Sequence, residues 1–392
     1  MIRQAALYLS TADDLQAARR PVAGHPVVFR AIVAAIRAGA RRVGVPAVLR
    51  SPGLAAALAT SPSTRVALAW LDTDALAAEP TLLLPAAALV PVPALAALLQ
   101  GPPGQVLAES QSSGAPALTV DASLLAVLHP TLIAGAPLGD GLRRELKSRD
   151  LAAIPSGGWF LHVTGERAAA KAEAYLWGDL GSAIDSPLDT AVHRRLSKPV
   201  TRVAVALGVG PNPITMTSGV VGLTAAASMA LGDAAALVVG LLLYLAAVVL
   251  DHADGEVARL TLSDSAIGEW LDIGIDTIVH IALVLALGVA AERIAGAGLA
   301  AGAVGAVGVV ASAVVGKRWP PPPPTAADRG LLDALTSRDG FYAMLLIFIA
   351  LRLTAPAGLP ALMMVIAVGT HAYWVARAAL SLRPGRAGGR RP

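Results

Sequence analysis

The second half of this 392-residue chain is built from long stretches without a charged side chain. Residues 203–232 contain no Asp, Glu, Lys or Arg, and neither do residues 234–250. A helix needs about 20 consecutive apolar residues to cross a bilayer, where its backbone polar groups must be satisfied internally. The residues after 202 are therefore predicted to form an all-α transmembrane domain.

Six membrane-spanning helices are predicted, with prolines and charged residues marking their ends. They cover approximately residues 214–232, residues 234–250 continuing into Asp251, and residues 268–291, 294–316, 340–353 and 358–382. The five prolines at 320–324 exclude a helix and predict an extended spacer between the fourth and fifth spans.

Lys and Arg are concentrated on one side of the six predicted spans. These residues are Arg194, Arg195, Lys198, Arg202, Arg259, Lys317, Arg318, Arg329, Arg338 and the tail RPGRAGGRRP. The opposite side holds little more than Arg293 and Arg352. The positive-inside rule places the basic side, with both ends of the chain, in the cytoplasm. We therefore expect a multi-pass protein of the cytoplasmic membrane.

The composition excludes several classes of protein. Only 15% of the residues are charged and 55% are hydrophobic, whereas a soluble protein carries about 25% charged residues. There is no cysteine, which excludes disulfides, zinc–thiolate sites, iron–sulfur clusters and a cysteine nucleophile. A net charge of +4 gives no strong case for binding nucleic acid.

Residues 1–185 differ from the rest, because short apolar runs alternate there with charged residues and prolines. No window reaches the length of a membrane helix, and the first residues lack the features of a signal peptide. Strand-like runs at 5–10 and 81–85 alternate with helical patterns, which predicts an open, mostly parallel α/β sheet. The expected domains are thus a cytoplasmic domain at 1–185 and the membrane domain at 186–392.

One segment of the membrane half carries a dense pattern of chemically active residues. At 100° per residue, one face at the end of the second span holds Asp251, Asp254, Gly255, Ala258 and Arg259. A face at the start of the third span holds Gly268, Asp272 and Asp276. An eight-residue connection between Arg259 and Gly268 would let the two faces meet as an antiparallel pair.

Four carboxylates at membrane depth need compensation. Each costs about 2.5–3.5 kcal/mol at a helix centre, and their mutual repulsion adds to this. Clustered oxygen ligands suit Mg²⁺ or Mn²⁺, and metals held in this way also bind phosphates. Arg259 would supply a planar fork for a phosphate. Two alternatives are an interfacial loop with ordinary ion pairs and a non-enzymatic, ion-coupled transporter, but the transporter leaves Arg259 and Gly268 unexplained.

The pattern D-x2-D-G-x2-A-R-x8-G-x3-D-x3-D resembles the signature of the CDP-alcohol phosphotransferases, or phosphatidyltransferases, at all eight fixed positions. The resemblance implies transfer of a substituted phosphoryl group from a CDP-linked donor to an alcohol, with release of CMP, in phospholipid or inositol-phosphate lipid synthesis. It implies two Mg²⁺ or Mn²⁺ ions and a homodimer. It implies that Asp251, Asp254 and Asp272 bind metal, that Asp276 is the general base and also touches metal, and that Gly255, Ala258, Arg259 and Gly268 line the CDP pocket.

Two neighbouring segments add to this resemblance. Residues 189–201 and the P-N-x-x-T sequence from Pro211 to Thr215 resemble the family's juxtamembrane helix and its entry to the first span. Asn212 and Thr215 would then contact the nucleotide, or else cap the helix. Arg338 at the fifth span would bind a substrate phosphate, or else only set the topology. His280 is expected to be a packed polar residue.

The N-terminal half resembles the sugar-phosphate nucleotidyltransferases at Pro21-Val-Ala-Gly-His-Pro26. A fusion of this kind resembles archaeal bifunctional enzymes that make CDP-inositol and then use it. Two departures argue against that activity: residues 10–20 contain no glycine to cradle a triphosphate, and Ala86–Ala88 replace the expected metal-binding Asp. Asp72 and Asp74 lie in a different context. We predict a degenerate domain, with the bifunctional enzyme as the alternative.

Overall fold

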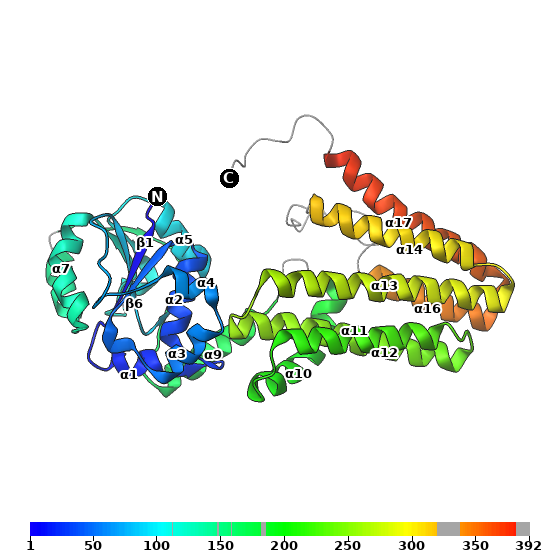
Figure 1. Ribbon diagram of the computed structural model, residues 1–392, viewed down its shortest axis with the longest axis horizontal. Coiled ribbons are helices and arrows are strands. Elements are labelled where there is room, and N and C mark those ends of the chain that lie inside the picture. Colours follow the sequence, from blue (N-terminus) through cyan, green and yellow to red (C-terminus); the bar gives the residue numbers. More distant parts are fainter. Residues whose placement is uncertain (112, 147–148, 158, 182–185, 320–337, 382–392) are drawn as a thin grey trace. The chain divides into compact units, whose positions relative to one another are not determined.

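The computed structural model describes residues 1–392 except 112, 147–148, 158, 182–185, 320–337 and 382–392 (Figure 1). The chain forms two compact units. One consists of Met1–Asp179 with Leu260–Ser263, and the other of Leu180–Arg259 with Asp264–Pro392. The proline-rich spacer predicted at 320–324 lies outside the described residues. The proposed boundary at 185 falls close to the division between Asp179 and Leu180.

The first unit is an α/β domain around a seven-stranded sheet with strand order β10-β8-β9-β6-β1-β4-β5. Its strands are β1 (Gln4–Tyr8), β4 (Arg42–Val45), β5 (Leu68–Trp70), β6 (Thr81–Pro85), β8 (Gln105–Leu107), β9 (Leu118–Val120) and β10 (Ala152–Ile154). β1 pairs in parallel with β4 and β6, and β9 runs antiparallel to β6 and β8. The predicted α/β class is confirmed, with one antiparallel strand in a mostly parallel sheet.

Helices surround this sheet, and two small two-stranded sheets complete the unit. The helices are α1 (Asp14–Arg19), α2 (Val27–Arg37), α3 (Pro52–Ala59), α4 (Pro62–Ala67), α5 (Val92–Gln100), α6 (Ala108–Gln111), α7 (Ala122–Ala134), α8 (Gly139–Leu146) and α9 (Glu166–Gly178). The small strand pairs are β2 (Pro21–Val22) with β3 (His25–Pro26), and β7 (Ala88–Leu89) with β11 (Leu161–His162). Every residue of β1 is buried, because this strand lies inside the sheet.

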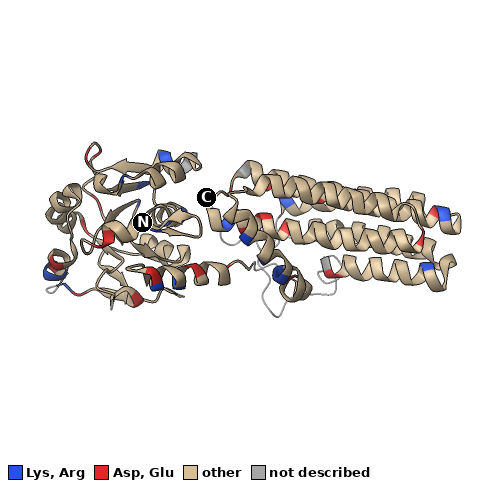
Figure 2. Cartoon of the chain, turned by 90° about the horizontal axis from the view of Figure 1, so that it is seen from below, with Lys and Arg blue, Asp and Glu red and all other residues tan. Residues whose placement is uncertain are grey.

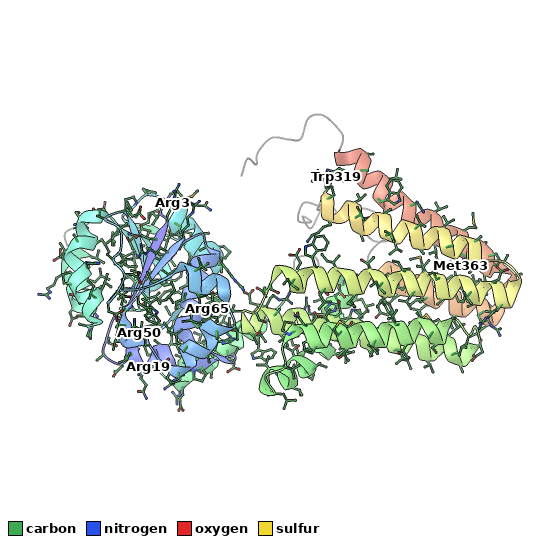
Figure 3. All side chains as sticks on the ribbon, viewed as in Figure 1. Arg3, Arg19, Arg50, Arg65, Trp319 and Met363 are labelled. Atoms are coloured by element: carbon green, nitrogen blue, oxygen red, sulfur yellow. The ribbon has the colours of Figure 1, made fainter. Side chains whose placement is uncertain are left out.

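The second unit is helical. It contains η2 (Asp189–His193), α10 (Arg194–Ala206), α11 (Pro211–Met229), α12 (Ala234–Thr261), α13 (Ala266–Ala295), α14 (Leu299–Arg318), α16 (Arg338–Thr354), η3 (Pro356–Gly358) and α17 (Leu359–Ser381). Met363 of α17, labelled in Figure 3, is fully buried in the core of this unit. Gly219 and Gly222 let α11 approach α13 closely, because a Cβ on either would lie 2.7 Å from a side-chain atom of Ile275 or Val279.

Four helices of the described residues are long and apolar enough to cross a membrane: Ala234–Thr261, Ile267–Ala295, Leu299–Arg318 and Pro356–Ala376. Figure 2 shows their Lys, Arg, Asp and Glu mainly near the helix ends. Large apolar side chains such as Val220, Leu242 and Val307 are exposed, as expected for contact with lipid. α11 and α16 form where the first and fifth spans are predicted, but α11 is rich in Thr and Ser and α16 has 17 residues. The six-span topology therefore stays a prediction.

The connection between α12 and α13 is shorter than predicted. α12 continues to Thr261 and α13 begins at Ala266, so four residues rather than eight link the helices. Leu262 turns the chain in the left-handed conformation, with φ of 54°. Ser265 then caps α13, because its side chain accepts a hydrogen bond from the backbone N–H of Gly268 at 3.0 Å. This cap starts α13 two residues before the first fixed position of the motif on that helix.

The proposed orientation can be tested at the two ends of α14. Trp319, labelled in Figure 3, is 41% exposed beside Lys317 and Arg318, and Ala297 is exposed before the other end. A cysteine at Ala297 should react with an impermeant maleimide in intact cells. A cysteine at Trp319 should react only after permeabilisation, because basic residues favour the cytoplasmic side. The chain has no cysteine of its own, so the unmodified protein is the blank. The opposite labelling pattern would contradict the proposed topology.

Candidate functional site

Three of the four predicted carboxylates come together in the helical unit. Asp251 and Asp254 of α12 and Asp272 of α13 each offer an oxygen, and these oxygens all lie within 4.8 Å of one another. Asp254 is only 4% exposed, and the other two are half-buried. Three carboxylates this close repel one another strongly unless a cation lies among them. The all-oxygen donor set fits Mg²⁺ or Mn²⁺.

Thr215 of α11 contacts this group directly. Its Oγ1 donates a hydrogen bond to Oδ2 of Asp254 at 2.5 Å, and both residues are buried. The N-cap residue of α11 is Gly210, which has no side chain to cap the helix. Asn212 lies beside Gly268, since a Cβ on that glycine would be 3.4 Å from Asn212 Oδ1. Neither residue therefore occupies the N-cap position of α11, and their contact with a nucleotide stays a prediction.

Asp276 lies one turn beyond Asp272 on α13 and is not part of the three-carboxylate group. Its side chain is 44% exposed, and its Oδ1 is 3.4 Å from Nδ1 of His280. The same Nδ1 is 2.8 Å from the backbone carbonyl of Asp276, and Nε2 of His280 is 3.2 Å from the hydroxyl of Tyr244. His280 also packs against the rings of Tyr244 and Phe341, as expected for a packed polar residue. The side chain of Asp276 is thus partly exposed and partly in contact with His280.

The remaining predicted site residues lie on α12 and at the start of α16. Nη2 of Arg259 donates to the carbonyl of Leu180 at 3.0 Å. A Cβ on Gly255 would lie 3.4 Å from Nη1 of Arg259, so the glycine leaves space for the guanidinium. Ala258 is half-buried on the same helix. Arg338 begins α16, but its side chain lies outside the part of the chain that the structure describes.

A second polar cluster lies beside the motif, made by Asp189, His193 and His252, all buried. Oδ1 of Asp189 is 2.8 Å from Nδ1 of His193 and 3.1 Å from Nε2 of His252, and its Oδ2 accepts from the Ser186 N–H at 2.9 Å. Burial by itself raises the pKa of Asp189, but the hydrogen bonds from His193, His252 and Ser186 outweigh it and hold the pKa well below its ordinary value. Because these are hydrogen-bond distances to a carboxylate with three partners, the cluster is explained without a metal ion.

Glu256 was not singled out by the sequence, although it is fully buried one residue after Gly255. Its carboxylate accepts hydrogen bonds from Arg194 Nη1 at 3.0 Å, Ser197 Oγ at 2.7 Å and Thr201 Oγ1 at 2.6 Å. The available signal was the spacing of His252 and Glu256, because two ionisable residues four positions apart lie on one face of a helix.

In the N-terminal unit, the loop after β1 is filled by a carboxylate. Asp14 is fully buried, and its Oδ2 accepts from the backbone N–H groups of Ser10 and Thr11 at 2.7 and 3.3 Å. Nε2 of His162 is 2.9 Å from Oδ1 of Asp14. Burial raises the pKa of Asp14, but these hydrogen bonds together lower it below the ordinary value. The backbone N–H groups of Ser10 and Thr11 therefore already have an anionic partner.

The acidic residues near the sheet have other roles. Asp72 forms a two-pronged ion pair with Arg50 at 2.8 and 2.9 Å, and Asp74 accepts from the backbone N–H of Trp70 at 3.1 Å. Both follow β5 rather than β6. Ala86–Ala88, which follow β6, are fully buried. Neither aspartate lies directly after β6, where the resemblance to nucleotidyltransferases places a metal-binding carboxylate.

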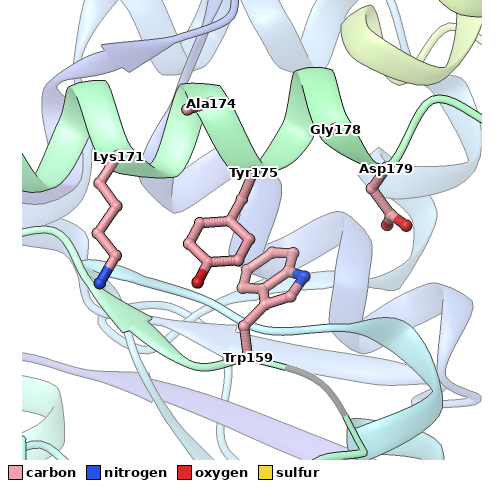
Figure 4. Close-up of a pocket in the computed structure, with 6 residues that line it drawn as sticks. All are labelled: Trp159, Lys171, Ala174, Tyr175, Gly178 and Asp179. Atoms are coloured by element: carbon pink, nitrogen blue, oxygen red, sulfur yellow. The ribbon is translucent and has the colours of Figure 1, made fainter.

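A separate pocket of about 410 Å³ opens on the N-terminal unit beside α9 (Figure 4). It is lined by Trp159, Lys171, Ala174, Tyr175, Gly178 and Asp179. The rings of Trp159 and Tyr175 are 5.5 Å apart, and the side chains of Lys171 and Asp179 flank them. None of the lining residues belongs to the loop after β1, so this pocket is not the position expected for a triphosphate.

The family-model comparison agrees with the motif. Residues 209–373 match the family model described as CDP-alcohol phosphatidyltransferase. Among solved structures, the chain is similar to Mycobacterium tuberculosis phosphatidylinositol phosphate synthase with CDP-DAG bound, at 18% identity and a TM-score of 0.39, over 50% of this chain and 100% of that chain. No curated protein matches the chain. The matched residues contain the whole motif from Asp251 to Asp276. The chain therefore carries a CDP-alcohol phosphatidyltransferase domain over residues 209–373.

Proposed function

We propose that this protein is an integral membrane phosphotransferase that moves a substituted phosphoryl group from a CDP-linked donor to an alcohol and releases CMP. The observation that carries the proposal is the convergence of Asp251, Asp254 and Asp272 within 4.8 Å, inside the family's matched segment. These carboxylates would hold Mg²⁺ or Mn²⁺, two ions by resemblance to the family. The bound metal would neutralise the pyrophosphate of the donor and stabilise the charge that develops on it.

The other residues would bind and activate the substrates. Asp276 would accept the proton of the acceptor hydroxyl as its oxygen attacks the β-phosphorus of the donor. The bond between this phosphorus and the oxygen bridging to the α-phosphate breaks, and CMP leaves with that oxygen. Gly255, Ala258, Arg259 and Gly268 would line the CDP pocket, with Asn212 and Arg338 as further contacts. Thr215 would act through its hydrogen bond to Asp254.

The setting of this reaction is part of the proposal. We place the active site and the N-terminal domain at the cytoplasmic face of the cytoplasmic membrane, and we expect a homodimer by resemblance to the family. Phospholipid or inositol-phosphate lipid synthesis is the expected pathway class. The donors to test are CDP-diacylglycerol with polar alcohols or alcohol phosphates, and CDP-inositol with lipid or inositol-phosphate acceptors.

The test is CMP release by the purified full-length protein in detergent or nanodiscs, with each donor and acceptor pair and with Mg²⁺ or Mn²⁺. Lipid extracts from cells with and without the gene would identify the product. CMP release with one pair, dependent on a divalent cation, supports the proposal. The absence of CMP release with every pair, together with unchanged lipid extracts, would contradict it.

We further propose that the N-terminal domain is a degenerate nucleotidyltransferase. Full-length protein given CTP and inositol phosphate or sugar phosphates should release no pyrophosphate. Nucleotidyl transfer needs free backbone donors around the triphosphate, and the donors of Ser10 and Thr11 are already bound by Asp14. It also needs a carboxylate-held metal, which Ala86–Ala88 cannot provide. The measurement is a coupled pyrophosphate assay with CTP, and CTP-dependent release would restore the bifunctional alternative.

A further inference from the structure

Two buried side chains of α12 face away from the proposed metal site. His252 follows Asp251 directly, and Glu256 follows Gly255. At 100° per residue, His252 lies about 200° around the helix from Asp254, so the two point to opposite sides. His252 and Glu256 lie one turn apart, and both are less than 10% exposed. The helix that carries two proposed metal ligands therefore also makes polar contacts on the face opposite Asp254.

The partners of these two residues come from the juxtamembrane segment. Asp189 of η2 contacts His252 at 3.1 Å, and Arg194 of α10 contacts Glu256 at 3.0 Å. Nδ1 of His252 is also 2.9 Å from the carbonyl of Val248, which fixes the orientation of the imidazole ring. The same cluster continues to α16, because Ser186 donates from N–H to Asp189 and from Oγ to Asp339 at 2.6 Å.

We infer that the buried Asp189–His252 pair is a positioning contact that fixes the rotation of α12 and thereby holds Asp251 and Asp254 in metal-binding geometry. This inference rests on the proposed function. A metal site tolerates displacements of only about 0.5 Å, and its supporting contacts provide that precision. Rotation of α12 would carry both ligands away from Asp272, which lies on α13. A hydrogen bond between buried charged or polar groups is well suited to prevent this, because the loss of a hydrogen bond costs more free energy for a buried group than for an exposed one.

The competing explanation is that the pair only stabilises the fold, and metal affinity separates the two. Purified full-length protein in nanodiscs can be titrated with Mn²⁺ without any substrate. Electron paramagnetic resonance then measures the concentration of free Mn²⁺ in the solution. His252→Phe keeps a ring but removes both nitrogens, and it should raise the dissociation constant for Mn²⁺ about tenfold. His252→Gln restores an N–H group, and its dissociation constant should stay within about threefold of the unmodified protein.

A matched control tests general destabilisation of α12. Oγ of Ser228, on α11, donates to the carbonyl of Ala236 at 2.8 Å. Ala236 lies near the N-terminal end of α12, far from the motif. Ser228→Ala should lower the thermal unfolding midpoint while leaving Mn²⁺ affinity unchanged. If His252→Phe does not fold, Asp189→Asn provides the same test, because it removes the charge at nearly constant volume and should also weaken Mn²⁺ binding.

The outcomes are distinguishable. Unchanged Mn²⁺ affinity in His252→Phe or Asp189→Asn, in a protein whose unmodified form binds Mn²⁺, would overturn the inference alone. Equal loss of affinity in Ser228→Ala would also overturn it, since the effect would then follow stability. Failure of the unmodified protein to bind Mn²⁺ would overturn the proposed metal site, and this inference with it.

Discussion

Replacing Asp254 or Asp272 with Asn is expected to lower metal-dependent CMP release by at least about a thousandfold, which corresponds to about 4 kcal/mol of transition-state stabilisation. Asn keeps the size of the side chain but removes the charge that balances the cation. Asp254 is expected to be the more sensitive position, because it is 4% exposed and also holds the hydrogen bond from Thr215. The measurement is CMP formation at saturating donor and acceptor over a range of Mg²⁺ and Mn²⁺ concentrations.

Asp233 provides the matched control for this prediction. It lies at the opposite end of α12, where its Oδ1 accepts from the backbone N–H of Ala236 at 2.9 Å. Asp and Asn are equally good at such a helix start, so Asp233→Asn should leave CMP release unchanged. Excess EDTA should abolish the activity of the unmodified protein. Full turnover in EDTA, or normal activity of the Asp254→Asn/Asp272→Asn double variant, would contradict the proposed function.

The grouping of Asp251, Asp254 and Asp272 could be predicted because each half of the motif lies within one helix. Helix geometry fixes which residues of 251–259 share a face, and the same holds for Gly268 and Asp272. A short connection between two helices then makes them neighbours. The length of that connection was overestimated, because nothing in the sequence marks the end of α12 at Thr261 as clearly as Ser265 marks the start of α13.

The contacts that support the site could not be predicted in the same way. Thr215 is 39 residues from Asp254, and Thr201 is 55 residues from Glu256. No local rule pairs side chains at such separations, since the pairing depends on how the helices pack. Likewise, the antiparallel strand β9 pairs with β6 across 35 residues or more, although the apolar run of β6 was recognisable by itself.

The N-terminal domain illustrates what a departure from a family pattern can indicate. The missing glycines of residues 10–20 and the alanines at 86–88 predicted that a triphosphate would not bind. The sequence did not indicate that Asp14 would bond to the backbone donors of the loop, or that His162, 148 residues away, would contact Asp14. Both contacts support the same proposal from independent parts of the fold.

Asp276→Asn is expected to lower the turnover number by about 10²–10⁴-fold, the usual contribution of a general base, while the affinity for CDP changes by no more than about threefold. The structural reason is the separate position of Asp276. It lies outside the group formed by Asp251, Asp254 and Asp272, and 44% of its side chain is exposed to an incoming acceptor. The measurements are CMP release at saturating substrates and equilibrium binding of CDP to the full-length protein in nanodiscs with Mg²⁺.

Asp272→Asn is the control for this prediction, because Asp272 lies one turn earlier on the same helix and the substitution makes the same change in charge. Loss of Asp272 should weaken CDP binding as well as turnover, since the pyrophosphate of CDP would contact the metal that Asp272 holds. Loss of Asp276 should affect only the step in which the acceptor hydroxyl gives up its proton. Equal loss of CDP affinity in both variants would assign Asp276 to the metal site as an essential ligand. The acceptor would then need another base, and the half-exposed position of Asp276 beside His280 would have a different explanation.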